Sequence, residues 1–144
     1  METIREIKSW FEAAVPHPTG DSRAVQLGVH FEEVEEMVEA MGFAHRFTPQ
    51  ETAACFKDRH PLYTQTVENM TTVQHVALLD ALCDQIVTAI GVAHMFGFDI
   101  EAALREVNRS NWSKFDSEGN PIFDAQGKIK KGEGYTPPDL KDFV

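Results

Sequence analysis

A long apolar run over residues 72–96, which includes VALLDALCDQIVTAIGVAHMF, constrains the fold more than any other feature. Its apolar side chains would occupy nearly every side of a helix, so it predicts a central helix that other helices cover. Asp80 and Asp84 interrupt the run one helical turn apart and share a helix face. These charges, with Gln85 and His94, break up the roughly 20 apolar residues that a membrane span needs, so no span is expected.

The two aspartates need a partner for their charge. An unpaired carboxylate in a core costs many kcal/mol of folding free energy or takes up a proton instead. No lysine or arginine occurs between His60 and Leu104. A divalent cation could supply the positive charge, because Mg²⁺ and Mn²⁺ prefer carboxylate oxygens. The alternatives are an ion pair with a distant Lys or Arg, or a strip that faces solvent.

A second acidic stretch, HFEEVEEMVEA, precedes the apolar run. It holds five glutamates between Glu32 and Glu39, with no Lys or Arg between Arg23 and Arg46. At 100° per residue four of the five glutamates share one helix face, and Glu33 lies about 100° from Glu32. A solvated acidic face is the simple interpretation, but like charges at i,i+4 are unfavourable and an external cation would relieve them. The stripe expected to pack on other helices is apolar: Leu27, Phe31, Val34, Val38 and Met41.

The rest of the sequence predicts an all-α fold of about five helices. The expected helices cover residues 2–14, from a cap at Asp21 or Ser22 to about Met41, from Thr48 to about Lys57, 72–96 and 100–115. The segment DRHPLYTQ is expected to be a loop. We expect one domain, with residues 1–115 as its helical catalytic part and residues 116–144 as an irregular extension that can form a small hairpin over IFDAQGKI.

Charge and cysteine content limit the class of function. The net charge is −10; residues 1–104 hold 16 acids against 6 Lys and Arg, and residues 105–144 hold 7 of each. Nucleic-acid binding is therefore not expected, because it requires cations to neutralise phosphates. Cys55 and Cys83 lack CxxC spacing and are expected to be buried apolar residues. The six histidines show no ligand spacing. The N-terminal METIREIKSW is not typical of a signal peptide, so we expect a cytoplasmic protein.

Four stretches in order carry a resemblance to a known family: EEVEE (32–36), DALCDQI (80–86), EVNRSNWSKF (106–115) and GKIKKGEGYTPPDL (127–140). With them the chain resembles the MazG-like all-α nucleotide pyrophosphohydrolases, in particular the branch with dUTPase-like and phage-encoded members. The resemblance covers about residues 24–140. The family's second motif is commonly ExxD; Asp84 matches its aspartate, Ala81 occupies the position three before, and Asp80 is the expected substitute because i and i+4 share a face.

The resemblance implies a Mg²⁺-dependent reaction, with Mn²⁺ as an alternative ion, in which water converts an NTP or dNTP to the monophosphate and pyrophosphate. It implies house-cleaning or control of the nucleotide pool. Metal ligands are expected to be the carboxylates of both stretches: Glu32, Glu35, Glu36, Asp80 and Asp84. Glu33 is the candidate general base, and Glu36 is also expected to act in catalysis. Substrate contacts are expected from polar and cationic residues nearer the C-terminus: Asn108, Arg109, Asn111, Lys114, Lys130, Lys131 and Tyr135.

Two alternatives stay open at this point: a phosphoribosyl-ATP pyrophosphohydrolase, and a non-catalytic helical interaction module that retains the fold. Trp112 and Tyr135 could stack on a base, although a tryptophan on an amphipathic helix is more often part of a core or interface. The predicted partner is a small-molecule nucleotide. A homodimer or homotetramer is also expected, because four shorter helices from one chain can hardly cover a 25-residue apolar helix.

Overall fold

The computed structural model describes residues 2–43, 49–58, 61–125 and 129–144. The described residues contain helices and no β-strand, which confirms the all-α class. Six α-helices lie in these ranges, one more than the sequence predicted. The elements, in order, are α1 (Glu2–Ala14), α2 (Gly20–Ala40), α3 (Pro49–Lys57), α4 (Pro61–Glu68), α5 (Thr72–Phe96), α6 (Ile100–Trp112) and the 3₁₀-helix η1 (Lys141–Phe143).

The long helix α5 has the predicted bounds because both of its ends carry strong local signals. Thr71 caps it: its side chain accepts the backbone N–H of Gln74, whose side chain accepts the Thr71 N–H in return. At the other end Gly97 adopts a φ of 79°, a left-handed conformation that glycine takes without steric cost. Asp99 then caps α6, as predicted, although α6 ends at Trp112 rather than at residue 115.

The predicted cap of α2 was wrong, and the predicted start of the third helix is not tested. Thr19, not Asp21 or Ser22, caps α2: the Thr19 side chain accepts the Ser22 N–H, and the Ser22 hydroxyl accepts the Thr19 N–H. The first residue of the expected third helix, Thr48, lies outside the described residues.

The segment predicted as a loop, DRHPLYTQ, contains the start of α4. Pro61 occupies its first position, where a missing N–H costs nothing and the fixed φ suits a helix. Tyr63 is buried and its ring stacks on Phe43, with 4.6 Å between ring centroids. Tertiary packing of one aromatic residue thus stabilises a helix too short to be evident from periodicity.

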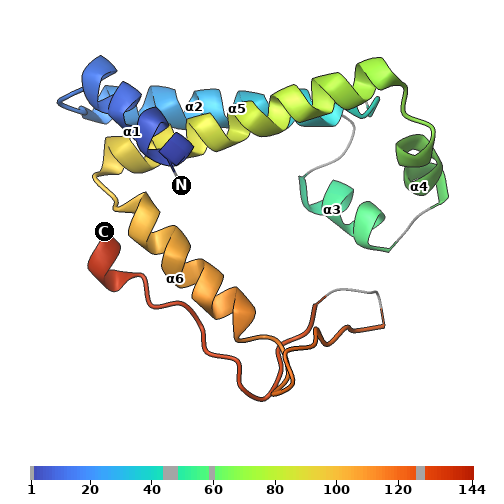
Figure 1. Ribbon diagram of the computed structural model, residues 1–144. Helices are drawn as coiled ribbons and strands as arrows, with labels where there is room; N and C mark the ends of the chain where they lie inside the picture. Colours follow the sequence, from blue (N-terminus) through green and yellow to red (C-terminus); the bar gives the residue numbers. More distant parts are fainter. Residues whose placement is uncertain (1, 44–48, 59–60, 126–128) are drawn as a thin grey trace.

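Helices α2 and α5 form the central antiparallel pair, side by side along the upper part of the molecule (Figure 1). Polar contacts fix their register. Gln26 Nε2 donates to the Thr88 carbonyl at 3.3 Å, and Gln85 Nε2 donates to the Glu33 carbonyl at 3.4 Å. The side of α2 that meets α5 therefore includes Gln26 and Glu33. Phe31, predicted in the packing stripe, lies on another side and is 70% exposed.

Helix α1 packs on the C-terminal half of α5. Phe11, Ile90 and Met95 form the buried cluster there. Partly buried apolar side chains surround it: Ile4, Ile7, Val15, Val87 and Ile100. Gly91 permits this contact, since a Cβ at that position would lie 2.2 Å from the Phe11 ring. His94 Nε2 lies 2.7 Å from the Val15 carbonyl oxygen and fixes the end of α1.

Helix α6 leaves the central pair and carries the C-terminal segment back along itself (Figure 1). Arg5 of α1 ties it to the bundle, because Nε and Nη2 donate to the two Glu101 carboxylate oxygens at 2.9 and 2.7 Å. These hydrogen bonds hold the pKa of Glu101 at about 2. The predicted hairpin is represented by an antiparallel bridge between Phe123 and Ile129; residues 126–128 of its turn lie outside the described residues.

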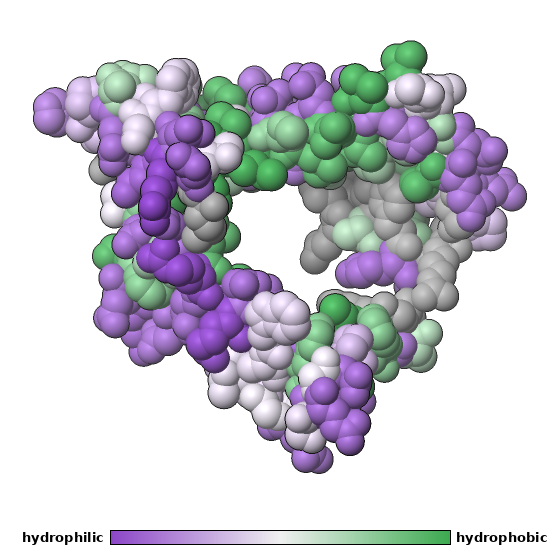
Figure 2. Space-filling model, viewed as in Figure 1, coloured by the Kyte–Doolittle hydropathy of each residue, from purple (hydrophilic) through white to green (hydrophobic). Residues whose placement is uncertain are grey.

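The chain is open rather than tightly packed, and the space-filling view retains an opening in its middle (Figure 2). Its accessible surface is 10214 Å² for a mass of 16.2 kDa, whereas a compact monomer of that mass exposes about 7,500 Å². Cys83 was expected to be buried and is exposed. By length and composition alone α5 could also cross a membrane, a test that core helices of soluble proteins pass as well.

Candidate metal and nucleotide site

Glu33 lies at the seam between α2 and α5, and its carboxylate is the most unusual group in this region. One oxygen, Oε2, is buried, and no hydrogen-bond partner reaches it. Burial raises the pKa of Glu33, and nearby carboxylates raise it further, in the order Glu36, Asp84, Glu32 and Asp80. The folded state therefore favours the protonated form of Glu33. As the pH rises, ionisation of Glu33 lowers the free energy of unfolding.

The four carboxylates that act on Glu33 come from the two acidic stretches that the sequence singled out. Glu32 and Glu36 belong to α2, and Asp80 and Asp84 to α5. Of these, Asp84 is half-buried and the other three are exposed. The packing of α2 on α5 thus brings both stretches within electrostatic range of one buried carboxylate. Glu35, which was also predicted as a ligand, is exposed and is not among the charges that raise the pKa of Glu33.

The structure also explains the departure from ExxD in the second motif. Ala81, at the position where the ExxD pattern of the resemblance would have its first acid, is buried with 3% of its surface exposed. Asp80, one residue earlier, is exposed and still acts on Glu33. A carboxylate at position 81 would be buried and would lose its hydration. At position 80 the carboxylate of Asp80 keeps its charge near solvent.

Thr88 and His30 connect α5 and α2 next to this cluster of carboxylates. The sequence predicted no role for either residue. The buried Thr88 hydroxyl donates to the Asp84 carbonyl at 2.8 Å, and His30 Nδ1 lies 2.8 Å from the same hydroxyl oxygen. Because the hydroxyl has a single hydrogen, Nδ1 carries a proton and donates to it. A threonine four residues after Asp84 in an apolar run was the signal that could have revealed this contact.

The donor set matches a hard divalent cation in its chemistry. Carboxylates from two helices act electrostatically on Glu33, whose buried Oε2 has no hydrogen-bond partner, and Mg²⁺ and Mn²⁺ prefer carboxylate oxygens. Across the ranges that the structure describes, no three His, Cys, Asp or Glu side chains stand in an arrangement that already could hold a metal ion. The five carboxylates repel one another, so they have no electrostatic reason to converge without a cation.

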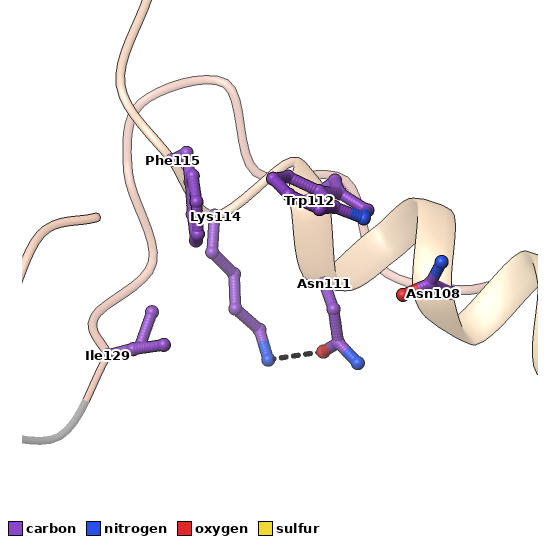
Figure 3. A pocket seen from close by; sticks show the side chains of 6 residues that line it. All are labelled: Asn108, Asn111, Trp112, Lys114, Phe115 and Ile129. Atoms are coloured by element: carbon purple, nitrogen blue, oxygen red, sulfur yellow. Dashed lines mark hydrogen bonds between the residues drawn. The ribbon is translucent and has the colours of Figure 1, made fainter. Parts of the chain in front are cut away.

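A separate open pocket of about 400 Å³ lies at the C-terminal end of α6 (Figure 3). Three of the predicted substrate residues line it: Asn108, Asn111 and Lys114. Trp112, Phe115 and Ile129 supply apolar surface. Lys114 Nζ donates to Asn111 Oδ1 at 2.7 Å, which leaves the ammonium group two further protons for an anionic ligand. The size and mixed lining suit a small molecule with one flat and one charged part.

The other predicted substrate residues have contacts within the C-terminal segment. Lys131 Nζ lies 4.5 Å from the centre of the Tyr135 ring, a cation–π contact. Lys130 is exposed. Arg109 donates to both oxygens of Glu106, to Thr136 Oγ1 at 2.6 Å and to the Pro137 carbonyl at 3.2 Å. Their binding to substrate stays a prediction.

Figure 1 places the end of α6 across the central opening from the α2–α5 pair. The structure therefore brings together the acids of the two motifs and, separately, the residues of the α6 pocket. No protein-family model matches this chain, and no curated protein matches it. The resemblance to MazG-like enzymes thus depends on the four sequence stretches alone.

The contact between Glu106 and the C-terminal segment gives a testable pH dependence. Hydrogen bonds from Arg109 and from the Asp139 N–H hold the pKa of Glu106 at about 2, below its ordinary 4.5. A lowered carboxylate pKa stabilises the folded state above about pH 4.5, and this contribution is lost as the pH falls toward 2. We expect Glu106→Gln to cause faster backbone hydrogen exchange at Asp139 and Thr136 at neutral pH. Wild type should lose the same protection in the acid range.

Glu118→Gln is the matched control, since it removes the same charge from an exposed turn outside this contact. Unchanged protection at Asp139 in Glu106→Gln would contradict the role assigned to the Glu106 carboxylate.

Proposed function

We propose that this protein is a divalent-metal-dependent nucleotide pyrophosphohydrolase of the MazG-like type, which acts on an NTP or dNTP in the cytoplasm. One observation carries the proposal: the buried, unpartnered oxygen of Glu33 lies among four carboxylates from two helices. This combination is unfavourable for stability alone, and a bound cation would convert it into a favourable one. The four ordered sequence stretches support the choice of reaction.

Glu32, Glu36, Asp80 and Asp84 would hold Mg²⁺ or Mn²⁺, with Glu35 predicted as a further ligand. When bound, the ion neutralises the triphosphate and favours ionisation of the attacking water. Glu33 is proposed to accept a proton from this water, because burial and the neighbouring carboxylates raise its pKa above the ordinary value and so make it a stronger base. The water oxygen forms the new bond to the α-phosphorus. The bond from the α-phosphorus to the oxygen that bridges the α- and β-phosphates breaks, and this oxygen leaves with pyrophosphate. The products are the monophosphate and pyrophosphate.

The α6 pocket is proposed to bind another part of the same nucleotide. Lys114 and Asn111 would contact phosphate or sugar oxygens, and the exposed ring of Trp112 offers a face on which a base can stack. Because α6 and the α2–α5 pair are separated by the opening, a nucleotide bound to both would require closure of this chain or a contribution from a second copy.

The test is an assay of the purified protein with the common NTPs and dNTPs in the presence and absence of Mg²⁺. We expect the monophosphate and pyrophosphate to form only when Mg²⁺ is present. A thermal-shift titration should show that Mg²⁺ raises the melting temperature, because an ion that binds only the folded state stabilises it. Release of inorganic phosphate in place of pyrophosphate would contradict the proposed reaction. No turnover and no Mg²⁺ response would contradict the proposal and would favour the non-catalytic interaction module.

A further inference from the structure

Thr88 of α5 receives polar contacts from α2 through both its backbone and its side chain. Its carbonyl accepts from Gln26 Nε2 at 3.3 Å, and its hydroxyl oxygen lies 2.8 Å from His30 Nδ1. Only 6% of Thr88 is exposed. Gln26 and His30 are four residues apart on α2 and share one side of it. Two successive turns of α2 are therefore fixed against a single residue of α5.

The polar contacts continue from Thr88 toward the acid cluster. Gln85 Nε2 donates to the Glu33 carbonyl at 3.4 Å. The contacts advance along α2 from Gln26 through His30 to Glu33. Along α5 they proceed the opposite way, from Thr88 to Gln85, because the two helices are antiparallel (Figure 1). They end at the residue whose side chain is the proposed general base.

The Thr88 hydroxyl also contacts a proposed metal ligand on its own helix. It donates to the Asp84 carbonyl at 2.8 Å, and the Gln85 carbonyl lies at 3.3 Å. Asp84 precedes Thr88 by four residues, so both side chains leave the same side of α5. A hydroxyl that bonds back to the preceding turn can also alter the path of the helix there. One hydroxyl thus connects the turn of α5 that carries Asp84 with the side of α2 that carries Glu33.

Apolar packing alone would leave the register of α2 on α5 poorly determined. Helix α5 has apolar residues in almost every turn, so successive turns offer α2 similar neighbours. A slip by one turn, about 5.4 Å, would move Glu33 past Asp84. It would also separate the buried Thr88 hydroxyl from His30, and a buried polar group that loses its partner costs free energy. Buried polar contacts are a well-attested means of fixing the register of paired helices.

We infer that Thr88 is a positioning residue for the proposed metal site: its hydroxyl, held by His30, sets the register that brings Asp84 to Glu33. Thr88 acts through these neighbours and does not itself bind the ion, because its hydroxyl already donates to Asp84 and accepts from His30. The inference rests on the proposed function, since it concerns the ion which that function requires.

The test replaces the Thr88 hydroxyl with a methyl group of similar size, in Thr88→Val. The full chain is titrated with Mg²⁺ alone while its melting temperature is measured. We expect the Mg²⁺ concentration that gives half of the rise in melting temperature to increase about tenfold or more, because loss of a residue that orients metal ligands lowers metal affinity by about 10- to 100-fold.

Thr88→Ser separates the hydrogen bonds of Thr88 from its packing. Serine keeps the hydroxyl and loses the methyl group, whereas valine keeps the methyl group and loses the hydroxyl. Thr88→Ser should therefore respond to Mg²⁺ near the wild-type concentration. If packing were the role of Thr88, the serine variant would be the impaired one.

Thr66→Val is the matched control for the loss of a threonine hydroxyl. The Thr66 hydroxyl donates to the Leu62 carbonyl, four residues before it, at the same distance of 2.8 Å. Thr66 belongs to α4, away from the contact between α2 and α5. Its valine variant should keep the wild-type response to Mg²⁺.

His30→Leu tests the other partner in the contact and leaves Thr88 in place. Leucine has a similar size and no N–H to donate, so this variant should also need more Mg²⁺. Because His30 acts through the Thr88 hydroxyl, adding His30→Leu to Thr88→Val should weaken the response no further. Additive losses would contradict the inference. If Thr88→Val does not fold, a wild-type Mg²⁺ response in His30→Leu overturns the inference and a weakened one supports it.

The activity assay gives an independent readout at saturating Mg²⁺. Thr88→Val should lower kcat by about tenfold and leave KM for the nucleotide unchanged, because the variant removes no contact with substrate. A Thr88→Val protein with wild-type Mg²⁺ response and kcat would overturn the inference and leave the proposed hydrolase function intact. A wild-type protein that neither responds to Mg²⁺ nor turns over nucleotides would refute the proposed function, and this inference with it.

Discussion

Glu36→Gln is expected to lower kcat/KM for the best nucleotide substrate by about 100-fold or more, which corresponds to about 2.7 kcal/mol of transition-state stabilisation. Glu36 is the charge that raises the pKa of Glu33 most. Glutamine keeps the size and hydrogen-bonding capacity of the side chain and removes the charge that a divalent cation would bind. Because Glu36 is exposed, the fold should be retained.

Asp84→Asn should cause a loss of the same order, although Asp84 belongs to the other helix, since the proposed site requires both. Both variants should also lose the rise in melting temperature with Mg²⁺. Glu39→Gln is the matched control: it removes the same charge from the same exposed acidic stretch, and the carboxylates that raise the pKa of Glu33 most are Glu36, Asp84, Glu32 and Asp80. Equal activity losses in Glu36→Gln and Glu39→Gln would mean that activity depends on the net charge of the acidic stretch and not on this site.

For Glu35→Gln the sequence and the structure lead to different expected losses of activity. Helical periodicity alone groups Glu35 with Glu32 and Glu36, so the sequence predicts a large loss. The carboxylates that raise the pKa of Glu33 most are Glu36, Asp84, Glu32 and Asp80, so we expect a smaller loss from Glu35→Gln than from Glu36→Gln.

The sequence was sufficient where short-range signals determine the structure. The bounds of α5 follow from the apolar run and from Gly97, and the start of α6 follows from Asp99. The packing of an acidic helix on α5 was also expected, since an apolar helix requires other helices to cover it. The signals for the helix ends lie within a few residues of the ends that they predict.

The sequence was not sufficient where the structure depends on which sides of two helices pack together. Periodicity predicted that Phe31 would pack on another helix, yet α2 meets α5 through its Gln26 and Glu33 side. Several sides of α2 could have met α5, and specific contacts with Thr88 selected one. The burial of Glu33 Oε2, the feature that supports its proposed role, follows from this choice and could not be predicted from helical periodicity.

Gly91→Val is expected to lower the free energy of unfolding by about 3 kcal/mol, the upper part of the usual range for overpacking a core. A Cβ at this position would lie 2.2 and 2.6 Å from two atoms of the Phe11 ring and 2.7 Å from Gln26 Nε2, so α1 or α2 must move. For a domain of this size such a loss lowers the melting temperature by about 6–12 °C, measurable by circular dichroism. Gly20→Val is the control, because nothing lies within 4 Å of a Cβ there.

A second substitution can show that the ring of Phe11 causes the loss. Phe11→Leu alone should destabilise the protein, because it removes buried aromatic surface from the cluster with Ile90 and Met95. In the Gly91→Val background the same change removes part of the clash, so the double variant should be more stable than the sum of the single losses predicts. Additive losses would mean that α1 does not rest on Gly91.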